Sequence, residues 1–469
     1  MAIRDSAKDP ASIRNTPDNV PFGAYHQRDI PRPDPLLSET GPGTPMGEYL
    51  RRFWQPVCLT EQLTDVPLAI RIMSEDLVAF RDRSGQNGVL NRYCSHRGAS
   101  LEYGRLDDEK GIRCCYHGWA FDVDGRILDI PGEPTESPLK TSFHHGAYPT
   151  LEFHGIVHAY MGPPELKPDF TAADIFDIPD VEFAAHALPL NNNWLQTHEN
   201  NVDPVHTVFL HSRYGGYFTD PIGFLPTLDW HTTGDGAGVM YTAGRRVDGQ
   251  SVWVRTLHCR VPNQGYVPSP YDLESPAYFQ RAFYLRVCVP VDDDNCIFFG
   301  WRAHNDGEFH GKNSDPAYNG WNKCSLEGQS EQPTYDLKQR SPGDWEAQSS
   351  QWGGTSRHQI EHLSAVDGGV ALTRRVLRNI LEGDVPTAWP EPANGNDVGR
   401  RVQNIYSQNT ICRLRQLADS DADRQMMKEF GLVVTEAVLD GDRFTRDVRK
   451  EHVVSRIKEI EAEFQARYA

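Results

Sequence analysis

The sequence predicts an α+β protein in which an all-β domain precedes a larger domain of antiparallel strands and helices. Residues 56–161 contain short runs of β-branched and aromatic residues, such as LAIRIM and DLVAFRD, which Gly, Pro, Asp and Asn separate at the spacing of an all-β unit. Residues 237–301 again have the pattern of strands, whereas VVSRIKEIEAEFQARY near the C-terminus has apolar residues every three and four positions, as in a helix.

These changes of pattern divide the chain into three expected segments. Residues 1–44 are polar and rich in Pro, Asp and Gly, and we expect an extended arm that either covers another surface or is partly mobile. Residues 45–165 form the expected β-domain, and residues 166–469 the α+β domain, with a polar, irregular surface segment at 302–343. Helical structure is expected at 45–54 and within 191–212, 344–382 and 421–467, with Glu361-His362-Leu363 and Arg374-Arg375 on solvated, salt-bridged helix faces.

Composition excludes several classes of function. The chain has 47 Lys and Arg against 65 Asp and Glu, and this net charge of −18 disfavours nucleic acids and anionic membranes as partners. No stretch is apolar enough for a membrane-spanning helix, and the polar N-terminus is not a secretory signal. Nine cysteines spread over 469 residues do not form a disulfide framework, so we expect reducing cytoplasm.

A cysteine–histidine pattern in the β-domain predicts a metal centre. Cys94-Ser-His96 is followed by Cys114-Cys-Tyr-His117, so each of two loops carries one thiol and one imidazole. A Cys2His2 zinc site is the alternative, but zinc knuckles usually pair Cys with Cys and His with His. Mixed loops favour a Rieske [2Fe–2S] cluster, in which one iron has two thiolates and the other two imidazoles. We expect Cys115 to be a core thiol on the opposite face.

The second domain contains a second candidate metal site, ENNVDPVHTVFLH, with His206 and His211. Two histidines and a distant carboxylate make the facial triad of non-haem Fe(II) oxygenases. A spacing of five does not keep both on one helix face, so we expect a π-type widening or a helix end between them. Asp203 lies three residues before His206, and its carboxylate can accept a hydrogen bond from that ring. The alternatives are two histidines without a metal and, for Asp203-Pro204, a helix start.

The motifs YCSHRGASLEYGRL and IRCCYHGWAFDVDG resemble the Rieske domain of Rieske non-haem iron ring-hydroxylating oxygenases. The flanking segments GPGTPMGEYLRRFWQPVCL and HHGAYPTLEFHGIVHAYMGPP are similar to the phthalate 4,5-dioxygenase-like oxygenase components, the large (alpha) subunits. This resemblance implies a C-terminal catalytic domain of the helix-grip, or Bet v1-like, type that holds a mononuclear Fe(II).

The resemblance also implies roles for individual residues. The stretch SPGDWEAQSSQWGGTSRHQIEHL is similar to the segment that supplies the third iron ligand, with one extra residue, and the match selects Asp344 ahead of Glu346 and Asp336. In this family an Asp at the position of Asp203 bridges the iron-bound His to a Rieske His of a neighbouring subunit, here His117. That arrangement implies a head-to-tail homo-oligomer, most simply a trimer.

The expected function is that of a terminal oxygenase, which inserts oxygen from O2 into an aromatic, carboxylated or methoxylated small molecule. Monohydroxylation, dihydroxylation and O-demethylation share this iron site. No G-x-G-x-x-G follows a strand, so the electrons must come from a separate NAD(P)H-dependent reductase of the flavin or ferredoxin type. The alternatives are a non-catalytic Rieske electron carrier with a degenerate iron site and a zinc-dependent structural module.

Overall fold

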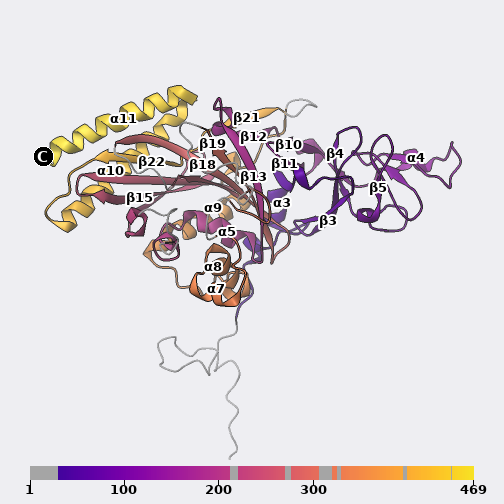
Figure 1. The fold of residues 1–469 in the computed structure, drawn as a ribbon, viewed down its shortest axis with the longest axis horizontal. Coiled ribbons are helices and arrows are strands. Elements are labelled where there is room, and N and C mark those ends of the chain that lie inside the picture. Colours follow the sequence, from indigo (N-terminus) through magenta and orange to yellow (C-terminus); the bar gives the residue numbers. More distant parts are fainter. Residues whose placement is uncertain are drawn as a thin grey trace, which may run out of the picture.

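The computed structural model of the chain describes residues 30–211, 220–269, 276–305, 319–324, 329–393, 399–444 and 446–469. The molecule is elongated, with an N-terminal β-rich part at one end and two long C-terminal helices at the other (Figure 1). The α+β prediction is confirmed, because small sheets precede one large sheet that helices cover. None of the helices in these ranges is long and apolar enough to cross a membrane.

The N-terminal part consists of three small sheets, ordered β1-β11-β10, β2-β3-β4-β9 and β5-β6-β7-β8, and it shares no strand with the large sheet. Strand β3 shows why the sequence folds this way, since its middle residues Leu77–Phe80 are buried against the neighbouring strands. The strands are β1 (Trp54–Leu59), β2 (Leu68–Ile72), β3 (Glu75–Arg81), β4 (Asn87–Asn91), β5 (Arg105–Leu106), β6 (Ile112–Arg113), β7 (Ala120–Phe121), β8 (Ile127–Asp129), β9 (Ala147–Tyr148), β10 (Thr150–Phe153) and β11 (Ile156–Tyr160).

The large sheet has nine strands in the order β14-β15-β16-β17-β18-β19-β13-β20, with β22 paired to both β16 and β18. Its long strands are mostly buried along their whole length, because both faces are covered. A separate parallel pair joins β12 to β21. The strands are β12 (Phe170–Ala173), β13 (Glu182–Leu190), β14 (Thr227–Thr232), β15 (Gly238–Asp248), β16 (Ser251–Arg260), β17 (Gln264–Pro268), β18 (Ala277–Pro290), β19 (Cys296–His304), β20 (Gly320–Trp321), β21 (Arg400–Gln403) and β22 (Gln408–Arg413).

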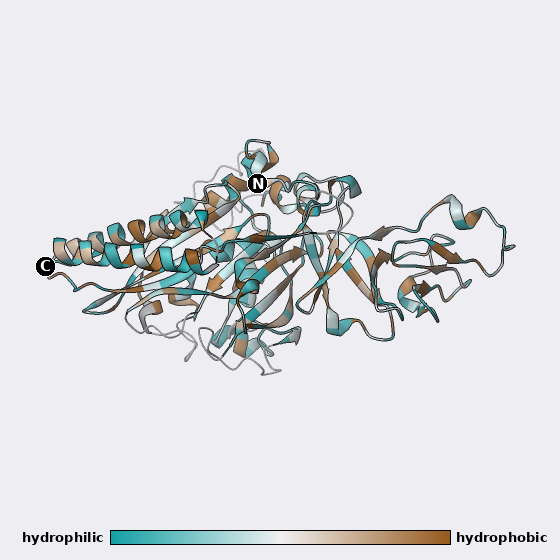
Figure 2. Ribbon diagram, turned by 90° about the horizontal axis from the view of Figure 1, so that it is seen from above, coloured by the Kyte–Doolittle hydropathy of each residue, from teal (hydrophilic) through white to brown (hydrophobic). Residues whose placement is uncertain are grey.

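Helices cover the large sheet on two sides (Figure 1). The C-terminal pair α10 and α11 lies side by side along the strands (Figure 2), and its Phe430 and Ile457 pack against Val252 of β16. On the other side lie α5, α8 and α9, which surround the candidate site described below. The helices are α2 (Pro35–Ser38), α3 (Pro45–Arg51), α4 (Leu139–Ser142), α5 (Trp194–Glu199), α6 (His206–Phe209), α7 (Tyr335–Arg340), α8 (Asp344–Ser350), α9 (Gly368–Leu381), α10 (Ser420–Asp440) and α11 (Arg446–Arg467).

Most expected helices are present, but the stretch 344–382 differs. The helical turn at 45–54 and the two C-terminal helices are confirmed. The expected helical stretch 344–382 is interrupted between α8 and α9, so residues 361–363 are not helical, which corrects the prediction. Gly353 and Gly354 explain the interruption, because both have positive φ (77° and 110°), a conformation that ends a helix.

The arm expected at 1–44 can be followed only from residue 30, because residues 1–29 lie outside the described residues. Leu37 is fully buried, and its carbonyl oxygen accepts a hydrogen bond from Nε1 of Trp194 at 3.2 Å. Asp34 forms an ion pair with Arg378 of α9. This part of the arm therefore packs on the helices below the large sheet.

Candidate metal centres

Two loops of the N-terminal part present the cysteine–histidine motif in the same local geometry. The amide of Gly98 donates to the carbonyl oxygen of Cys94 at 2.8 Å, and the amide of Gly118 donates to that of Cys114 at 3.2 Å. Both glycines have positive φ, 73° and 76°, which a residue with a side chain rarely adopts. The sequence therefore forms two matching tight turns, each placing one thiol and one imidazole.

The four side chains face one another as pairs of equal type. Cys94 and Cys114 are buried, and burial together with the neighbouring Cys114 thiol raises the pKa of Cys94 to about 11. The rings of His96 and His117 lie 4.5 Å apart between centroids. Nδ1 of His96 is buried and has no hydrogen-bond partner among the described residues. Paired thiols, paired imidazoles and a buried free ring nitrogen fit a [2Fe–2S] cluster of the Rieske type.

Two residues without a predicted role hold these loops. Oγ of Ser95 contacts Nδ1 of His145 at 2.6 Å in the first loop. Beside the second loop, Arg113 donates to the carbonyl oxygen of Gly118 at 2.6 Å and pairs with Asp107 at 2.9 Å, which holds the pKa of that carboxyl below its ordinary value. The sequence gives no spacing signal for His145, whereas Arg113 directly precedes the cysteine pair.

Cys115 corrects one expectation, because the thiol is exposed and not part of the core. Strand β6 ends at Arg113, so Cys115 lies in a turn, where the alternation of strand side chains does not apply. Tyr116 and His117 are exposed beside it, and the side chain of Tyr116 is 62% accessible. The tip of this loop therefore presents an aromatic ring and an imidazole to the surroundings.

His206, His211 and Asp344 come together in the second part of the chain, with one possible ligand atom from each within 4.8 Å of the others. Nε2 of His211 lies 3.3 Å from Oδ2 of Asp344, and Nε2 of His206 lies 3.8 Å from Oδ1. Two ligand atoms at a right-angled corner of a metal roughly 2.1 Å away are about 3 Å apart. The donor set and these separations therefore fit a six-coordinate divalent metal with open positions.

The local fold explains how two histidines at a spacing of five reach one site. Helix α6 has a single turn, His206–Phe209, and the amide of Leu210 closes it by donating to the carbonyl oxygen of His206 at 2.8 Å. His211 follows after this end and is buried, whereas His206 is half-buried. Of the two expected distortions, the structure has the helix end.

Asp203 contacts His206 in a way that differs from the expectation. Nδ1 of His206 donates to the backbone carbonyl oxygen of Asp203, while the carboxylate Oδ2 is 3.6 Å from that nitrogen. The carboxylate instead accepts from the amides of Val205 (3.0 Å) and His206 (3.3 Å), so it does cap the helix start. Since Nδ1 carries the proton, Nε2 of His206 has its lone pair available for a metal.

The three acidic candidates for the third ligand have different surroundings. Asp344 begins α8 and is buried, with Gly343 as the capping residue before it. Glu346 accepts from the amides of Gly343 (2.9 Å) and Gln332 (2.7 Å), so both of its carboxylate oxygens already have donors. Asp336 pairs with Arg340 on the exposed face of α7. The structure brings only Asp344 of these three to the histidines.

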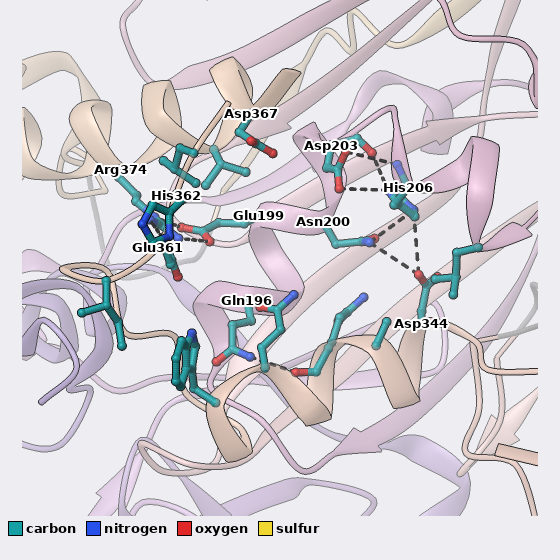
Figure 3. A pocket seen from close by; sticks show the side chains of 18 residues that line it. Gln196, Glu199, Asn200, Asp203, His206, Asp344, Glu361, His362, Asp367 and Arg374 are labelled. Atoms are coloured by element: carbon teal, nitrogen blue, oxygen red, sulfur yellow. Dashed lines mark hydrogen bonds and ion pairs between the residues drawn. The ribbon is translucent and has the colours of Figure 1, made fainter. Parts of the chain in front are cut away.

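Two amide side chains that the sequence did not point out lie against His206 and Asp344. Nδ2 of Asn200 lies 3.2 Å from Nε2 of His206 and 3.5 Å from Oδ1 of Asp344 (Figure 3). Nε2 of Gln329 donates to Oδ2 of Asp344 at 2.6 Å. Asn200 lies within the motif that carries the histidines, so its place in the sequence could have indicated a position close to the site. Gln329 comes from a distant irregular segment that has no motif.

Electrostatics favour the ionised carboxylate here. Burial alone raises the pKa of Asp344, but His211, His206 and Arg286 outweigh it, and the net pKa lies well below the ordinary value. Burial lowers the pKa of His206, yet Asp203 and Asp344 outweigh it and the net pKa is raised. The pocket thus stabilises positive charge between these residues, as a metal site requires.

An open cavity of about 490 Å³ reaches His206 and Asp344 of the triad, and Asn200, Asp203, His206 and Asp344 line one end of it (Figure 3). At its other end Arg374 pairs with Glu199 (2.6 Å) and with Glu361 (2.5 Å). Arg374 is buried, so the expected solvated helix face at 374–375 is wrong for this residue. The exposed apolar side chains Trp352 and Leu363 also line the cavity.

Comparison with known proteins identifies a Rieske domain in the N-terminal part and relatives that span most of the chain. Residues 53–145 match the family described as Rieske [2Fe-2S] domain. The oxygenase subunit of tert-butanol monooxygenase / tert-amyl alcohol desaturase from Aquincola tertiaricarbonis is 39% identical, over 94% of this chain and 96% of its own length. The phenoxybenzoate dioxygenase subunit alpha from Ectopseudomonas oleovorans is 40% identical, over 76% of this chain and 86% of its own length.

Solved structures share the fold. The caffeine-bound NdmA of Pseudomonas putida CBB5 superposes with a TM-score of 0.56 at 20% identity, over 75% of this chain and 99% of that chain. Dicamba monooxygenase bound to dicamba superposes with a TM-score of 0.52 at 16% identity, over 72% of this chain and 99% of that chain. At these identities the likeness concerns the fold alone.

Proposed function

Because the chain belongs to the family of Rieske non-haem iron oxygenases, as an oxygenase (alpha) subunit, we propose that His206, His211 and Asp344 hold its mononuclear iron. The observation that carries this proposal is the convergence of two imidazoles and one carboxylate at one end of an open cavity. When bound there, a non-haem Fe(II) offers open positions at which O2 is activated. The residues of the chain position this ion, bind the substrate and limit the access of water to the site.

Metal analysis tests the iron site. The holoprotein should contain about three irons and two acid-labile sulfides per chain, two irons in the cluster and one in the triad. His206→Ala should lose one iron and all substrate turnover but keep the Rieske EPR signal. His452→Ala, on α11 far from both centres, is the matched control. A wild-type protein with two irons would support the alternative of a non-catalytic electron carrier, and a colourless zinc protein the structural module.

The proposal includes a head-to-tail homo-oligomer, most simply a trimer. Within one chain the cluster loops lie at the far end of the N-terminal part, away from α5 and α8, which surround the triad (Figure 1). Asp203 is half-buried and faces the open cavity, whose lining includes exposed Trp352 and Leu363. The loop tip with Tyr116 and His117 is exposed as well, so both surfaces are open to a second copy, which in this proposal supplies the cluster.

Mixing two inactive variants tests electron transfer between chains. Cys114→Ser should remove the cluster and leave the triad, and His206→Ala should remove the triad and leave the cluster. Co-expressed, they should regain oxygenase activity only if one chain's cluster serves its neighbour's iron. Activity that stays absent in a mixed oligomer of confirmed composition would contradict this arrangement, as would a monomer by analytical ultracentrifugation.

We further propose that a separate reductase of the flavin or ferredoxin type supplies the electrons, as multicomponent oxygenase subunits require. We also propose that the protein is located in reducing cytoplasm. None of the nine cysteines, all of which lie among the described residues, forms a disulfide, which supports the location. Purified protein should therefore oxidise substrate with chemical reductant or with a reductase, and not with NADH alone.

Three buried arginines support a carboxylated substrate. A second cavity of about 60 Å³ shares Asn200, Asp203 and His206 with the open one. Arg245, Arg255 and Arg286 line it from strands β15, β16 and β18, and each is at most 6% accessible. Three guanidinium groups thus line one small space, and among the described residues of its lining Asp203 is the single carboxylate.

These arginines contact neutral oxygens. Nε of Arg245 donates to the carbonyl oxygen of Phe224 (3.0 Å), and Arg255 donates to Oδ1 of Asn409 (3.2 Å). Arg286 donates to Oδ1 of Asn201. Burial and the nearby Arg255 lower the pKa of Arg245 to about 10.

Three other buried arginines pair with carboxylates instead of neutral oxygens. Arg51 pairs with Glu75, Arg374 with Glu199, and Arg449 with Asp174, at 2.6 to 3.3 Å. A buried cation without a counterion is unfavourable. A substrate carboxylate beside the iron would add a negative charge to this arginine-rich pocket, so the pocket fits the phenoxybenzoate type of relative better than a neutral tertiary alcohol.

Equilibrium binding of small molecules to the iron-loaded protein tests the substrate class. Each carboxylate is compared with a neutral compound of similar shape: benzoate with benzamide, and pivalate with pivalamide and tert-butanol. We expect at least one anion to bind about tenfold or more tightly than its neutral partner. Arg255→Gln and Arg286→Gln should weaken anion binding about 10- to 100-fold and leave amide binding unchanged. Arg246→Gln, whose side chain pairs with Asp423 outside the cavity, is the control. Equal or tighter binding of the neutral compounds would contradict a carboxylated substrate without affecting the iron proposal.

A further inference from the structure

A chain of buried polar side chains runs from Asp344 to the large sheet. Nε2 of Gln329 donates to Oδ2 of Asp344 at 2.6 Å, and Oε1 of the same amide accepts from Sγ of Cys324 at 3.3 Å. Oη of Tyr284 on β18 lies 3.0 Å from that sulfur and 2.9 Å from Nε2 of His186 on β13. All five side chains are at most 8% accessible.

The carboxylate of Asp344 fixes the orientation of the Gln329 amide. As a metal ligand Asp344 is a carboxylate, which only accepts, so the amide of Gln329 must present its NH2 to it and its oxygen to Cys324. The thiol of Cys324 donates its one proton to that oxygen. The hydroxyl of Tyr284 lies between this sulfur and the ring of His186, which burial keeps neutral by lowering its pKa to about 3.

The fixed amide distinguishes the two oxygens of Asp344. Oδ2 receives the short hydrogen bond from Gln329 and faces His211, whereas Oδ1 faces His206 and Asn200 at 3.8 and 3.5 Å. Asp344 begins α8, and Gln329 lies in the segment before α7. The hydrogen bonds therefore tie the carboxylate of a peripheral helix to two strands of the rigid sheet.

We propose that Gln329 is a positioning residue for the mononuclear metal, and that Cys324 and Tyr284 hold its amide in the only orientation that donates to Asp344. This inference rests on the proposal that Asp344 is an iron ligand. A flipped amide would turn its oxygen toward the carboxylate, and the repulsion would rotate Asp344 away from the histidines. Metal ligands that lose such a partner typically bind metal 10–100-fold more weakly.

Affinity for Co2+ at the mononuclear site, measured by competition with a colorimetric chelator in cluster-loaded protein, tests the inference. Gln329→Leu should weaken Co2+ binding about 10- to 100-fold. Cys324→Ala should weaken it less, and Cys324→Ser should recover most of the loss, because a hydroxyl donates and accepts in the same way. Tyr284→Phe should have the smallest effect. Gln339→Leu, on the exposed face of α7, is the control.

Two results would overturn the inference. One is wild-type Co2+ affinity in Gln329→Leu, and the other is equal weakening by Cys324→Ser and Cys324→Ala, since that would indicate a role in packing alone. The Rieske EPR signal and the thermal midpoint should stay at wild-type values in the Cys324 pair, which separates positioning from folding. If wild-type protein binds no metal at the triad, the proposed function fails as well, whereas a normal wild-type site with an unaffected Gln329→Leu variant removes only this inference.

Discussion

Asp344 and Glu346 are both carboxylates on the first turn of α8, yet their surroundings give them separate tasks. Asp344 faces the two histidines, and Glu346 caps the helix through the amides of Gly343 and Gln332. A helix turns about 100° per residue, so two positions apart they point to opposite sides. The roles follow from that geometry, because the chemistry of the two side chains is the same.

Substituting each carboxylate should therefore have different consequences. Asp344→Asn should lose the mononuclear iron, since it removes the anionic ligand. Glu346→Gln should keep the iron and lower the stability by about 1 kcal/mol through the weaker cap. Iron content and urea unfolding of both variants check this. Loss of iron in Glu346→Gln with retention in Asp344→Asn would reverse the assignment.

The adjacent thiols Cys114 and Cys115 offer a second test at the scale of single residues. Cys114 is buried opposite Cys94, and Cys115 is exposed. We expect Cys114→Ser to abolish the visible absorption of the cluster and Cys115→Ser to leave it unchanged, because only a thiol that faces the centre can be a ligand. A cluster that survives Cys114→Ser would contradict the choice of ligand.

At the scale of elements, local spacing predicted what one segment builds by itself. The repeated Cys-x-His and Cys-x-x-His spacings predicted the two turns, and the spacing of five between His206 and His211 predicted a break in the helix. The approach of α8 to α6 had no such signal, because it depends on how distant segments pack. Gln329, Arg286 and Arg374 were missed or misjudged for this reason, since their partners come from other elements.

Arg374 illustrates an element-scale interaction that can be measured. It ties α9 to Glu199 at the end of α5 and to Glu361, and all three side chains are largely buried. Burial raises the pKa of Glu199 and Arg374 opposes this shift. Arg374→Met should lower the stability by about 3–5 kcal/mol, because it leaves a buried carboxylate without a partner.

The double variant Glu199→Gln with Arg374→Met provides the control, since it removes both charges. It should be more stable than Arg374→Met alone in urea unfolding. Equal stability of the two variants would show that the guanidinium contributes packing and little electrostatic compensation.

At the scale of the whole molecule, the periodicity of the sequence predicted the α+β class, the β-rich N-terminal part and the C-terminal helices. It did not predict the order of strands in the large sheet, in which β13 lies between β19 and β20, because pairing over such distances leaves no local pattern. The net charge of −18 disfavoured nucleic acids and anionic membranes as partners, but it did not reveal the three buried arginines beside the candidate iron site. A local cluster of positive charge in a protein of negative net charge becomes visible only in the folded structure.

The buried histidines predict how the stability of the whole molecule depends on pH. Burial lowers the pKa of His158 to about 4 and those of His186 and His258 to about 3. In the unfolded chain these groups titrate near 6.5, so below that pH the unfolded state binds more protons than the folded state. Stability should thus fall as the pH drops from 6.5 toward 4, by about 1.4 kcal/mol per unit for each histidine.

His258→Phe isolates one of these contributions. His258 packs between the rings of Tyr266 and Tyr406, which an aromatic replacement can also contact. At pH 7.5 the comparison with wild type measures the change in packing alone, because the histidine is neutral in both states. At pH 5 the wild type should have lost about 2 kcal/mol more than the variant, relative to their values at pH 7.5. Urea unfolding at the two pH values checks this, and parallel losses in the two proteins would show that His258 takes up protons in the folded state as readily as in the unfolded chain.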